Sequence, residues 1–421
     1  MTASKAPTNL YILRLSFIHF ATGILLLLTA MLAAIWLIPD IAQLGTFRVT
    51  EGWLLAHLLL LGFASMTAIG ASYQLVQVIM RTALFSRPLG YVQYVCYTVG
   101  LLLILLGFGW RIQFVAPGGT LVIIGIILYC VNMGMTLLRK REWNPFVLGI
   151  ALSAAAFLAA GVMGTLLGLY LAGNLPSALS ALEYDVLFGS HLWLGIGGWL
   201  SGLIVVFSFK LLPMFYVSPK KVTRQVYAII GGFHTGIGLQ VVSLWLRQDT
   251  LTLAAYLIIG GSAVWFTIYL FRVRALSRAK SPVGAVRTAF WLIPLHTALF
   301  LLWGAMIQLH IAEDLLHESV LAFITLGWFI PSILAYLSKI LPFLWWAHRF
   351  RTGAQKKAAV LLSEMLPERR LTLELTGYII GAALLSIGFY YGSAAIVVLG
   401  QVLMTGFLLV YLCELTRTFR Y

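Results

Sequence analysis

Twelve apolar segments, each long enough to cross a lipid bilayer, constrain this fold more than any other feature of the sequence. A helix needs about 20 residues to span the ~30 Å hydrocarbon core, and backbone groups in lipid must be hydrogen-bonded within their own segment. Hydrophobic residues make up 61% of the 421 residues and charged residues only 10%, unlike a soluble globular protein. The sequence therefore predicts an all-α, polytopic membrane bundle with spans at about 12–38, 53–80, 90–110, 119–138, 146–172, 186–213, 226–246, 251–271, 285–308, 314–346, 372–391 and 393–416.

The basic residues are distributed unevenly between the two sides of this bundle. The chain has 28 Lys and Arg against 13 Asp and Glu, a formal net charge of +15. Loops on one side hold most of them, and loops on the other side hold only Arg48, Arg111 and Arg247. Because positively charged loops stay in the cytoplasm, we expect a multi-pass protein of the cytoplasmic membrane with both termini cytoplasmic. Anionic lipid of the bilayer, and not nucleic acid, is the expected partner of this charge.

Spans two, six and ten each carry a histidine near the start: His57, His191 and His317. In this topology even-numbered spans run inward, so all three imidazoles are expected about one to two turns below the outer surface. A histidine at membrane depth is uncommon and is a functional-site hypothesis by default. We therefore expect these three helices to line the interior and the remaining helices to surround them.

The same spans indicate an internal repeat. Gly198 and Gly327 are each followed by Trp, and each lies 12 residues before the lysine of a Lys-x-x-Pro sequence, Lys210 or Lys339. The first copy keeps the His and a Gly-Phe pair but not the Lys-x-x-Pro ending. Chance similarity between apolar segments is the alternative explanation. A true repeat predicts one transmembrane domain of three four-helix blocks in pseudo-threefold arrangement, at about 1–142, 143–280 and 281–421.

One predicted loop is longer than the others. Residues 347–371 mix apolar residues with basic and acidic ones. This composition predicts a cytoplasmic amphipathic segment that lies on the membrane surface.

Three further histidines, His19, His234 and His296, lie within the spans. A neutral imidazole binds heme iron or copper well, but a single buried histidine can equally be bonded to a backbone carbonyl. The shared depth of His57, His191 and His317 favours a metal or heme site for those three. For His234 and His296, copper binding or proton relay stands beside simple hydrogen bonding. No ladder of mid-membrane carboxylates is predicted, which argues against an ion-driven pump.

Several short motifs resemble a known superfamily. They are Ala-His57 followed by Gly62-Phe63 in span two, Gly-Trp in spans six and ten, and the Lys-x-x-Pro endings. This pattern resembles the catalytic subunits of heme-copper oxidases and nitric oxide reductases, and more closely their small single-subunit relatives, including the NnrS-type heme and copper membrane proteins. The resemblance extends over the whole twelve-span layout.

The resemblance implies an outer-side, low-spin heme b held by His57 and His317, because the superfamily uses histidines of helices two and ten. It implies copper less directly: His191 matches one copper ligand, but span seven offers only His234 and no His-His pair. Span ten also has His317-Glu-Ser where the oxidases have His-x-His. The binuclear oxygen-reducing centre is therefore expected to be absent or altered, with a second metal or heme position involving His191, His234 or His296. Arg48, Arg111 and Arg247 are the expected partners of the heme propionates.

Two functions follow from these expectations. The first is a heme protein that transfers electrons, or that binds or reduces nitric oxide or another small gas, with a quinol or cytochrome as redox donor. Oxidoreductase activity stays open because the oxidase ligand set is incomplete. The second is a membrane transporter or metallation factor that holds heme or copper transiently.

Overall fold

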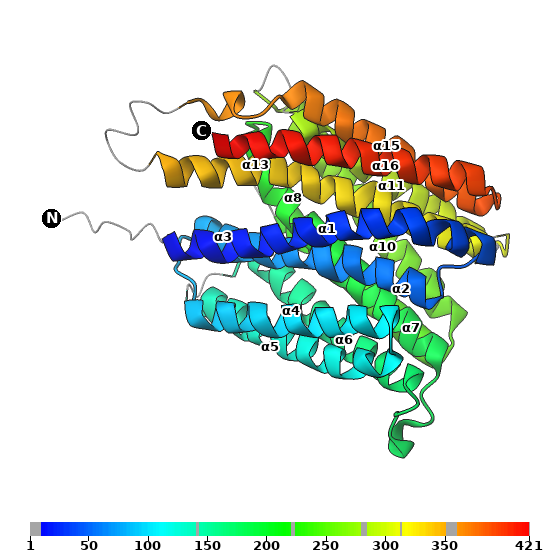
Figure 1. The fold of residues 1–421 in the computed structure, drawn as a ribbon. Coiled ribbons are helices and arrows are strands. Elements are labelled where there is room, and N and C mark those ends of the chain that lie inside the picture. Colours follow the sequence, from blue (N-terminus) through cyan, green and yellow to red (C-terminus); the bar gives the residue numbers. More distant parts are fainter. Residues whose placement is uncertain are drawn as a thin grey trace.

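The structure, a computed structural model, describes residues 10–139, 143–219, 224–278, 284–311, 314–350 and 360–420. Within these ranges it contains 12 helical segments that are long and apolar enough to cross a membrane. They lie roughly parallel to one another (Figure 1). The prediction of an all-α, polytopic membrane bundle is confirmed.

Nine of the spans in the described ranges are single α-helices. They are α1 (Leu10–Leu44), α4 (Arg87–Gly109), α5 (Val115–Leu138), α6 (Pro145–Leu171), α9 (Arg224–Leu246), α10 (Asp249–Ala275), α11 (Gly284–Gln308), α15 (Glu368–Tyr390) and α16 (Ala394–Thr416). Two of them begin with well-formed caps. The side chain of Ser86 accepts from the backbone N–H of Leu89 ahead of α4, and that of Asn144 accepts from Val147 ahead of α6, with Pro in the first turn of each helix.

The other three spans are each interrupted by a π-helical segment. Span two consists of α2 (Thr50–Ala56), η1 (His57–Ser65) and α3 (Met66–Met80). Span six consists of α7 (Tyr184–Leu192), η4 (Trp193–Ser201) and α8 (Gly202–Phe215). Span ten consists of α12 (Asp314–Ile324), η5 (Thr325–Phe329) and α13 (Ile330–Arg349). Short 3-10 turns complete the fold at η2 (Ile112–Phe114), η3 (Ser177–Leu179), η6 (Leu362–Glu364) and η7 (Arg417–Arg420).

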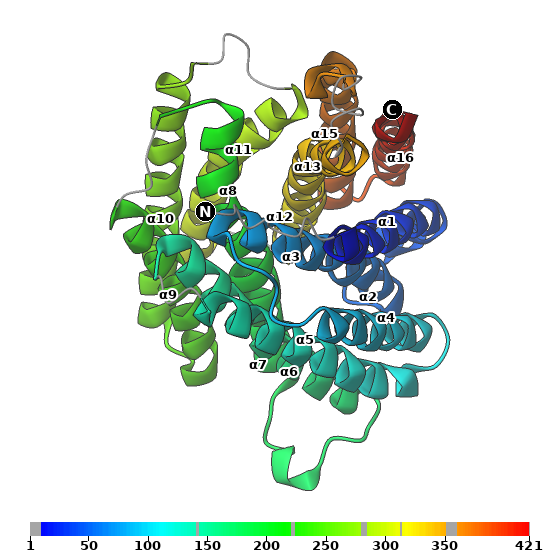
Figure 2. The same ribbon diagram turned by 90° about the vertical axis from the view of Figure 1, so that its left-hand side faces the viewer.

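The helices pack in the same order in all three blocks. Within each block the third and fourth spans form a hairpin: α4 with α5, α9 with α10, and α15 with α16. The first span packs on the second, as α1 does on α3, α6 on η4 and α11 on α13. Contacts of α5 with α6, α10 with α11, and α16 with α1 close the ring of blocks. Figure 2 shows the blocks as three sectors, blue to cyan, green, and yellow to red. This repeated pattern supports the predicted pseudo-threefold arrangement.

Glycines bring the hairpin helices close together. A Cβ at Gly100 of α4 would lie 2.6 Å from the backbone N of Val122 in α5, and one at Gly381 of α15 would lie 2.7 Å from the N of Met404 in α16. Neither position tolerates a side chain without a backbone shift. Small residues at such contacts are typical of membrane helices, where close packing replaces the hydrophobic effect as the driving force.

Spans two, six and ten form the interior, as predicted from their sequence. Their most apolar stretches are 67%, 67% and 56% buried. The span Glu368–Tyr390 also reaches 56%, whereas the other eight described spans lie between 28% and 44%. The π-helical segments η1 and η4 contact each other, and α13 contacts η1. Whatever the centre of the bundle holds is therefore surrounded by these three helices.

The predicted amphipathic segment falls only partly within the described residues. Its first residues, up to Arg349, belong to the last turn of α13, and its last residues, from Glu368, belong to the first turn of α15. Leu362–Glu364 form the short turn η6 between them. Residues 351–359 lie outside the described ranges, so the surface helix stays a prediction.

Candidate functional site

A cavity of about 540 Å³ lies between the three interior spans, and residues from all three blocks line it. This volume is within the ~300–1,000 Å³ range of pockets that enclose a drug-sized ligand. Most of its wall is apolar and consists of Leu, Ile, Val, Phe, Trp and Gly residues. Four imidazoles interrupt that apolar wall: those of His57, His191, His296 and His317.

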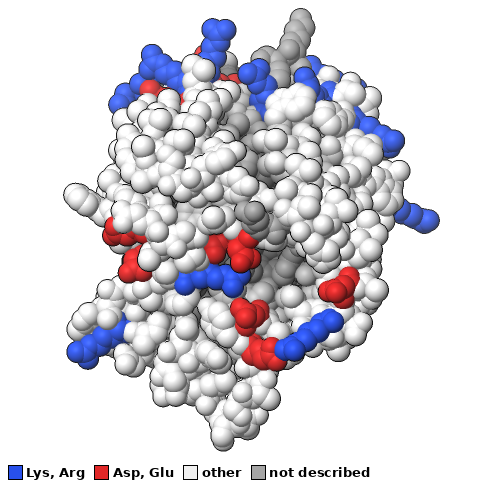
Figure 3. Space-filling model, turned by 90° about the vertical axis from the view of Figure 1, so that its right-hand side faces the viewer, with Lys and Arg blue, Asp and Glu red and all other residues white. Residues whose placement is uncertain are grey.

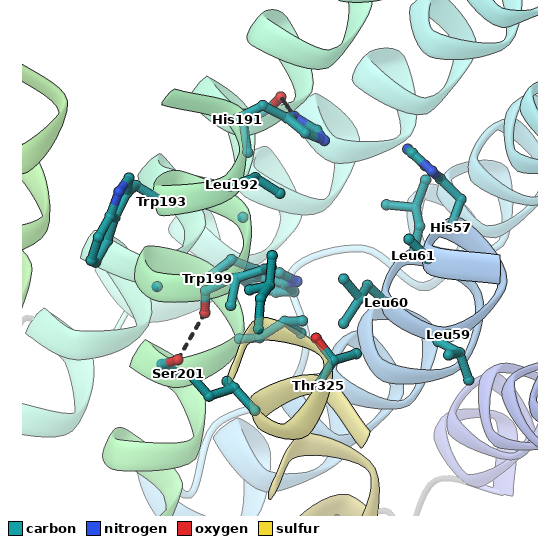
Figure 4. A pocket seen from close by; sticks show the side chains of 18 of the residues that line it. His57, Leu59, Leu60, Leu61, His191, Leu192, Trp193, Trp199, Ser201 and Thr325 are labelled. Carbon is teal, nitrogen blue, oxygen red and sulfur yellow. Dashed lines mark hydrogen bonds between the residues drawn. The ribbon is translucent and has the colours of Figure 1, made fainter. Parts of the chain in front are cut away.

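His57 and His191 face each other across this cavity. Their ring centroids are 6.3 Å apart and their planes differ by only 15°. The two rings come from opposite walls, one from span two and one from span six, and point toward one another (Figure 4). This opposed pair is the most specific arrangement of polar groups in the cavity.

Backbone hydrogen bonds fix both rings. His57 donates from Nδ1 to the carbonyl oxygen of Trp53, one turn earlier, at 2.7 Å. His191 donates from Nδ1 to the carbonyl oxygen of Ala160 in α6 at 2.8 Å. Because Nδ1 carries the proton in both residues, Nε2 keeps its lone pair, which is the state that a metal ligand needs.

The π-helical segments adjoin both histidines. η1 begins at His57, and η4 begins at Trp193, two residues after His191. In each segment a serine hydroxyl donates to the carbonyl five residues earlier, Ser65 to Leu60 at 2.8 Å and Ser201 to Ile196 at 2.8 Å. Both bonds span five residues, the same interval as a π-helical backbone hydrogen bond. π-Helical turns are rare and occur frequently at functional sites.

Small residues of α6 make room for the His191 ring. A Cβ at Gly164 would lie 2.8 Å from Cε1 of His191 and 3.0 Å from its Nδ1. Gly161, Gly164 and Gly168, spaced for one helix face, all line the cavity. The ring can therefore lie flat enough on α6 to reach the Ala160 carbonyl.

His317, the partner that the resemblance implied for His57, lines the same cavity from α12. Its ring centroid lies 5.9 Å from that of Trp303, with the planes 71° apart. The ring placed opposite His57 is that of His191. The structure therefore brings together two of the predicted ligands, in a pairing that the sequence did not indicate.

The rings of His296 and His234 are each held by protein groups. His296 is 4% exposed, donates from Nδ1 to the Leu292 carbonyl at 2.8 Å, and lies between the rings of Phe323 and Trp328. Its Nε2 is enclosed and has no hydrogen-bond partner among the described residues. His234 bonds to the Ile230 carbonyl and to the Ser153 hydroxyl, 3.0 and 3.1 Å away. Both nitrogens of His234 are thus used within the protein.

Of the three predicted propionate partners, Arg48 is the one that lines the cavity. It lies at the distal end, which we define as the end where Thr50, Tyr184 and Asp314 begin the interior spans. Arg48 pairs with Asp185 at 3.6 Å, and Arg247 pairs with Glu183, while the guanidinium of Arg111 lies over the ring of Trp110. Figure 3 views this end and shows acidic side chains beside its few basic ones.

A carboxylate attaches the Arg48 loop to span ten. Glu318, next to His317, accepts from the Thr46 hydroxyl at 2.7 Å and from the backbone N–H of Phe47. The Thr46 hydroxyl in turn accepts from the backbone N–H of Arg48 at 3.0 Å. Glu318 thus holds the loop between spans one and two over the cavity.

Sequence reasoning missed two residues at the centre of the site. The indole N–H of Trp199 donates to the hydroxyl of Ser65 at 3.0 Å, which joins η4 to η1. The repeated Gly-aromatic-x-Ser sequence, at Gly62 to Ser65 and Gly198 to Ser201, was the available signal. The role of this motif depends on π-helical hydrogen bonding, which cannot be recognised from the pattern of apolar residues.

Comparison with known proteins gives no family for the chain: no protein-family model matches it, and no curated protein matches it.

Proposed function

We propose that this chain is a membrane-embedded electron-transfer protein that binds one heme b between His57 and His191. The observation that carries the proposal is the separation of 6.3 Å between two nearly parallel imidazoles that point at each other. A metal–nitrogen bond is about 2.0–2.1 Å long, and a ring nitrogen lies about 1 Å from the ring centre, so two imidazoles on opposite sides of one ion have centroids about 6 Å apart.

The donor set favours heme over a metal ion that the protein alone would hold. In the part of the chain that the structure describes, no group of three or more His, Cys, Asp or Glu is placed to hold a metal ion. Two opposed imidazoles suit a metal that brings its own equatorial ligands, as the porphyrin of heme does. The large apolar cavity around the pair is the surrounding that such a macrocycle requires.

Two histidine ligands favour electron transfer over gas chemistry. Heme would supply one-electron redox chemistry, and two histidine ligands would leave it no free position for oxygen or nitric oxide to bind. His57 and His191 hold fixed tautomers through the Trp53 and Ala160 carbonyls. A rigid ligand pair changes little between the two oxidation states, and the apolar wall keeps water away.

Arg48 is the proposed propionate partner. It precedes His57 by nine residues along the chain, just before the start of α2. Arg48 lines the cavity, where it also pairs with the exposed Asp185, and neither Arg111 nor Arg247 lines that cavity. With the positive-inside orientation, the heme lies toward the outer side of the cytoplasmic membrane.

The test is the optical spectrum of the detergent-purified protein, with its heme content measured as the pyridine complex. The proposal expects about one heme b per chain and sharp reduced bands that carbon monoxide leaves unchanged. A transporter or metallation factor would instead lose heme during purification and release it readily to apomyoglobin. A protein that binds no heme when it is reconstituted would contradict the proposal.

A further inference from the structure

We infer that Ser65 and Trp199 are positioning residues that set the relative orientation of the His57 and His191 imidazoles. The inference rests on the proposed heme site and adds to it two residues that are not heme ligands. Its basis is a single buried hydrogen bond that joins the two helices carrying the histidines.

The bond is buried, and the Ser65 hydroxyl takes part in a second hydrogen bond. Trp199 Nε1 donates to Ser65 Oγ at 3.0 Å, and Ser65 Oγ donates to the carbonyl of Leu60 at 2.8 Å. Trp199 is 1% exposed and Ser65 is 2% exposed. The indole also stacks on Phe157 of α6, with centroids 4.1 Å apart and planes 4° apart. The indole therefore cannot turn away from Ser65 without losing both contacts.

The positions of the four residues explain why this bond matters for the histidines. Ser65 lies eight residues after His57, and Trp199 lies eight residues after His191. Each pair is joined by a π-helical segment, η1 or η4. The imidazole pair therefore lies at one end of the two segments, and the Trp199–Ser65 bond lies at the other. Losing that bond lets one segment rotate or slide against the other.

The third block provides an internal comparison. Trp328 follows Gly327 as Trp199 follows Gly198, but its Nε1 has no hydrogen-bond partner among the described residues. The position that corresponds to Ser65 and Ser201 is Ile330. The inter-block Trp–Ser bond therefore joins the two blocks whose histidines face each other.

The experiment compares the purified wild type with Ser65→Ala, Ser65→Thr, Trp199→Phe, Ser65→Ala/Trp199→Phe and, as a control away from the cavity, Trp346→Phe. Electron paramagnetic resonance of the oxidised heme reports the angle between the imidazole planes, and transfer to apomyoglobin reports the rate of heme loss. We expect Ser65→Ala and Trp199→Phe to retain heme but to shift the low-spin g-values toward those of crossed planes. Heme loss should accelerate roughly fivefold in both, equivalent to one hydrogen bond of about 1 kcal/mol.

Three results complete the test. The double variant should match the single variants, because both remove the same bond, and Ser65→Thr should restore the wild-type g-values. Trp346→Phe, which removes an indole hydrogen bond to the Val360 carbonyl outside the cavity, should behave as wild type. If Ser65→Ala has the same g-values and the same rate of heme loss as the wild type, the inference is overturned while the heme proposal stays intact. A wild type without heme would overturn both.

Discussion

His57 and His191 present their rings to each other at 6.3 Å with planes only 15° apart, although 134 residues separate them in the chain. Each ring is fixed by a backbone carbonyl, that of Trp53 or Ala160, and each lies beside a π-helical segment. The pair therefore depends on the packing of two helices and of a third, α6, which supplies the Ala160 carbonyl. Substitutions in any of these three helices should therefore affect binding of the proposed heme.

Gly164→Ala should weaken heme binding without unfolding the bundle. The added Cβ would lie 2.8 Å from Cε1 of His191, so the ring must move away from the Ala160 carbonyl. We expect at least a tenfold loss of heme affinity, measured by titration of heme into the heme-free protein. Gly134→Ala is the control, because a Cβ there meets nothing within 4 Å. Equal affinities in the two variants would show that the His191 ring does not depend on this space.

Arg48→Gln should lower the midpoint potential of the heme. Removing a positive charge near the iron favours the ferric form, which carries one more positive charge than the ferrous form. Arg48 is about half exposed, so screening by solvent limits the change to some tens of millivolts. Potentiometric titration measures the change, and Arg111→Gln, which removes an arginine stacked on Trp110, should leave the potential unaltered. A potential that rises in Arg48→Gln would contradict its assignment to the propionates.

Glu318→Ala should destabilise the distal end of the bundle. It removes the acceptor of two hydrogen bonds, from the Thr46 hydroxyl and the Phe47 amide. Hydrogen bonds to a charged group contribute about 1.5–3 kcal/mol each, so we expect a clear drop in the thermal unfolding temperature in detergent. Glu183→Ala breaks only an exposed ion pair with Arg247, worth about 0–1 kcal/mol. Similar unfolding temperatures for the two variants would mean that Glu318 does not anchor the loop.

The architecture could be predicted from the sequence because the bilayer restricts what an apolar chain can form. Segment length and backbone hydrogen bonding left helices as the expected spans, and the Gly-Trp and Lys-x-x-Pro motifs indicated the repeat. Helix ends were less predictable. α1 continues through Pro39 to Leu44, beyond the expected end at 38, since one proline removes a single backbone hydrogen bond while the helix can continue.

The partner of His57 could not be predicted, for a geometric reason. Measured from Gly62, Gly198 and Gly327, the histidines lie 5, 7 and 10 residues earlier. Those offsets place the imidazoles at similar depths, but each residue turns the side chain by about 100° around the helix. The depth of each histidine therefore did not reveal the direction in which its side chain points around the helix. The π-helical turns after His57 and His191 change that direction further. Only the packed structure brings His191 opposite His57.

The central claim is that His57 and His191 are the two axial ligands of one heme. The most direct test is the reduced-minus-oxidised absorption spectrum of the purified wild type beside His57→Ala, His191→Ala, His317→Ala and, as a control, His234→Ala. We predict that the low-spin bands are lost in the first two variants and retained in the last two. Loss of the bands in His317→Ala together with their retention in His191→Ala would contradict this claim and support the pairing of helices two and ten.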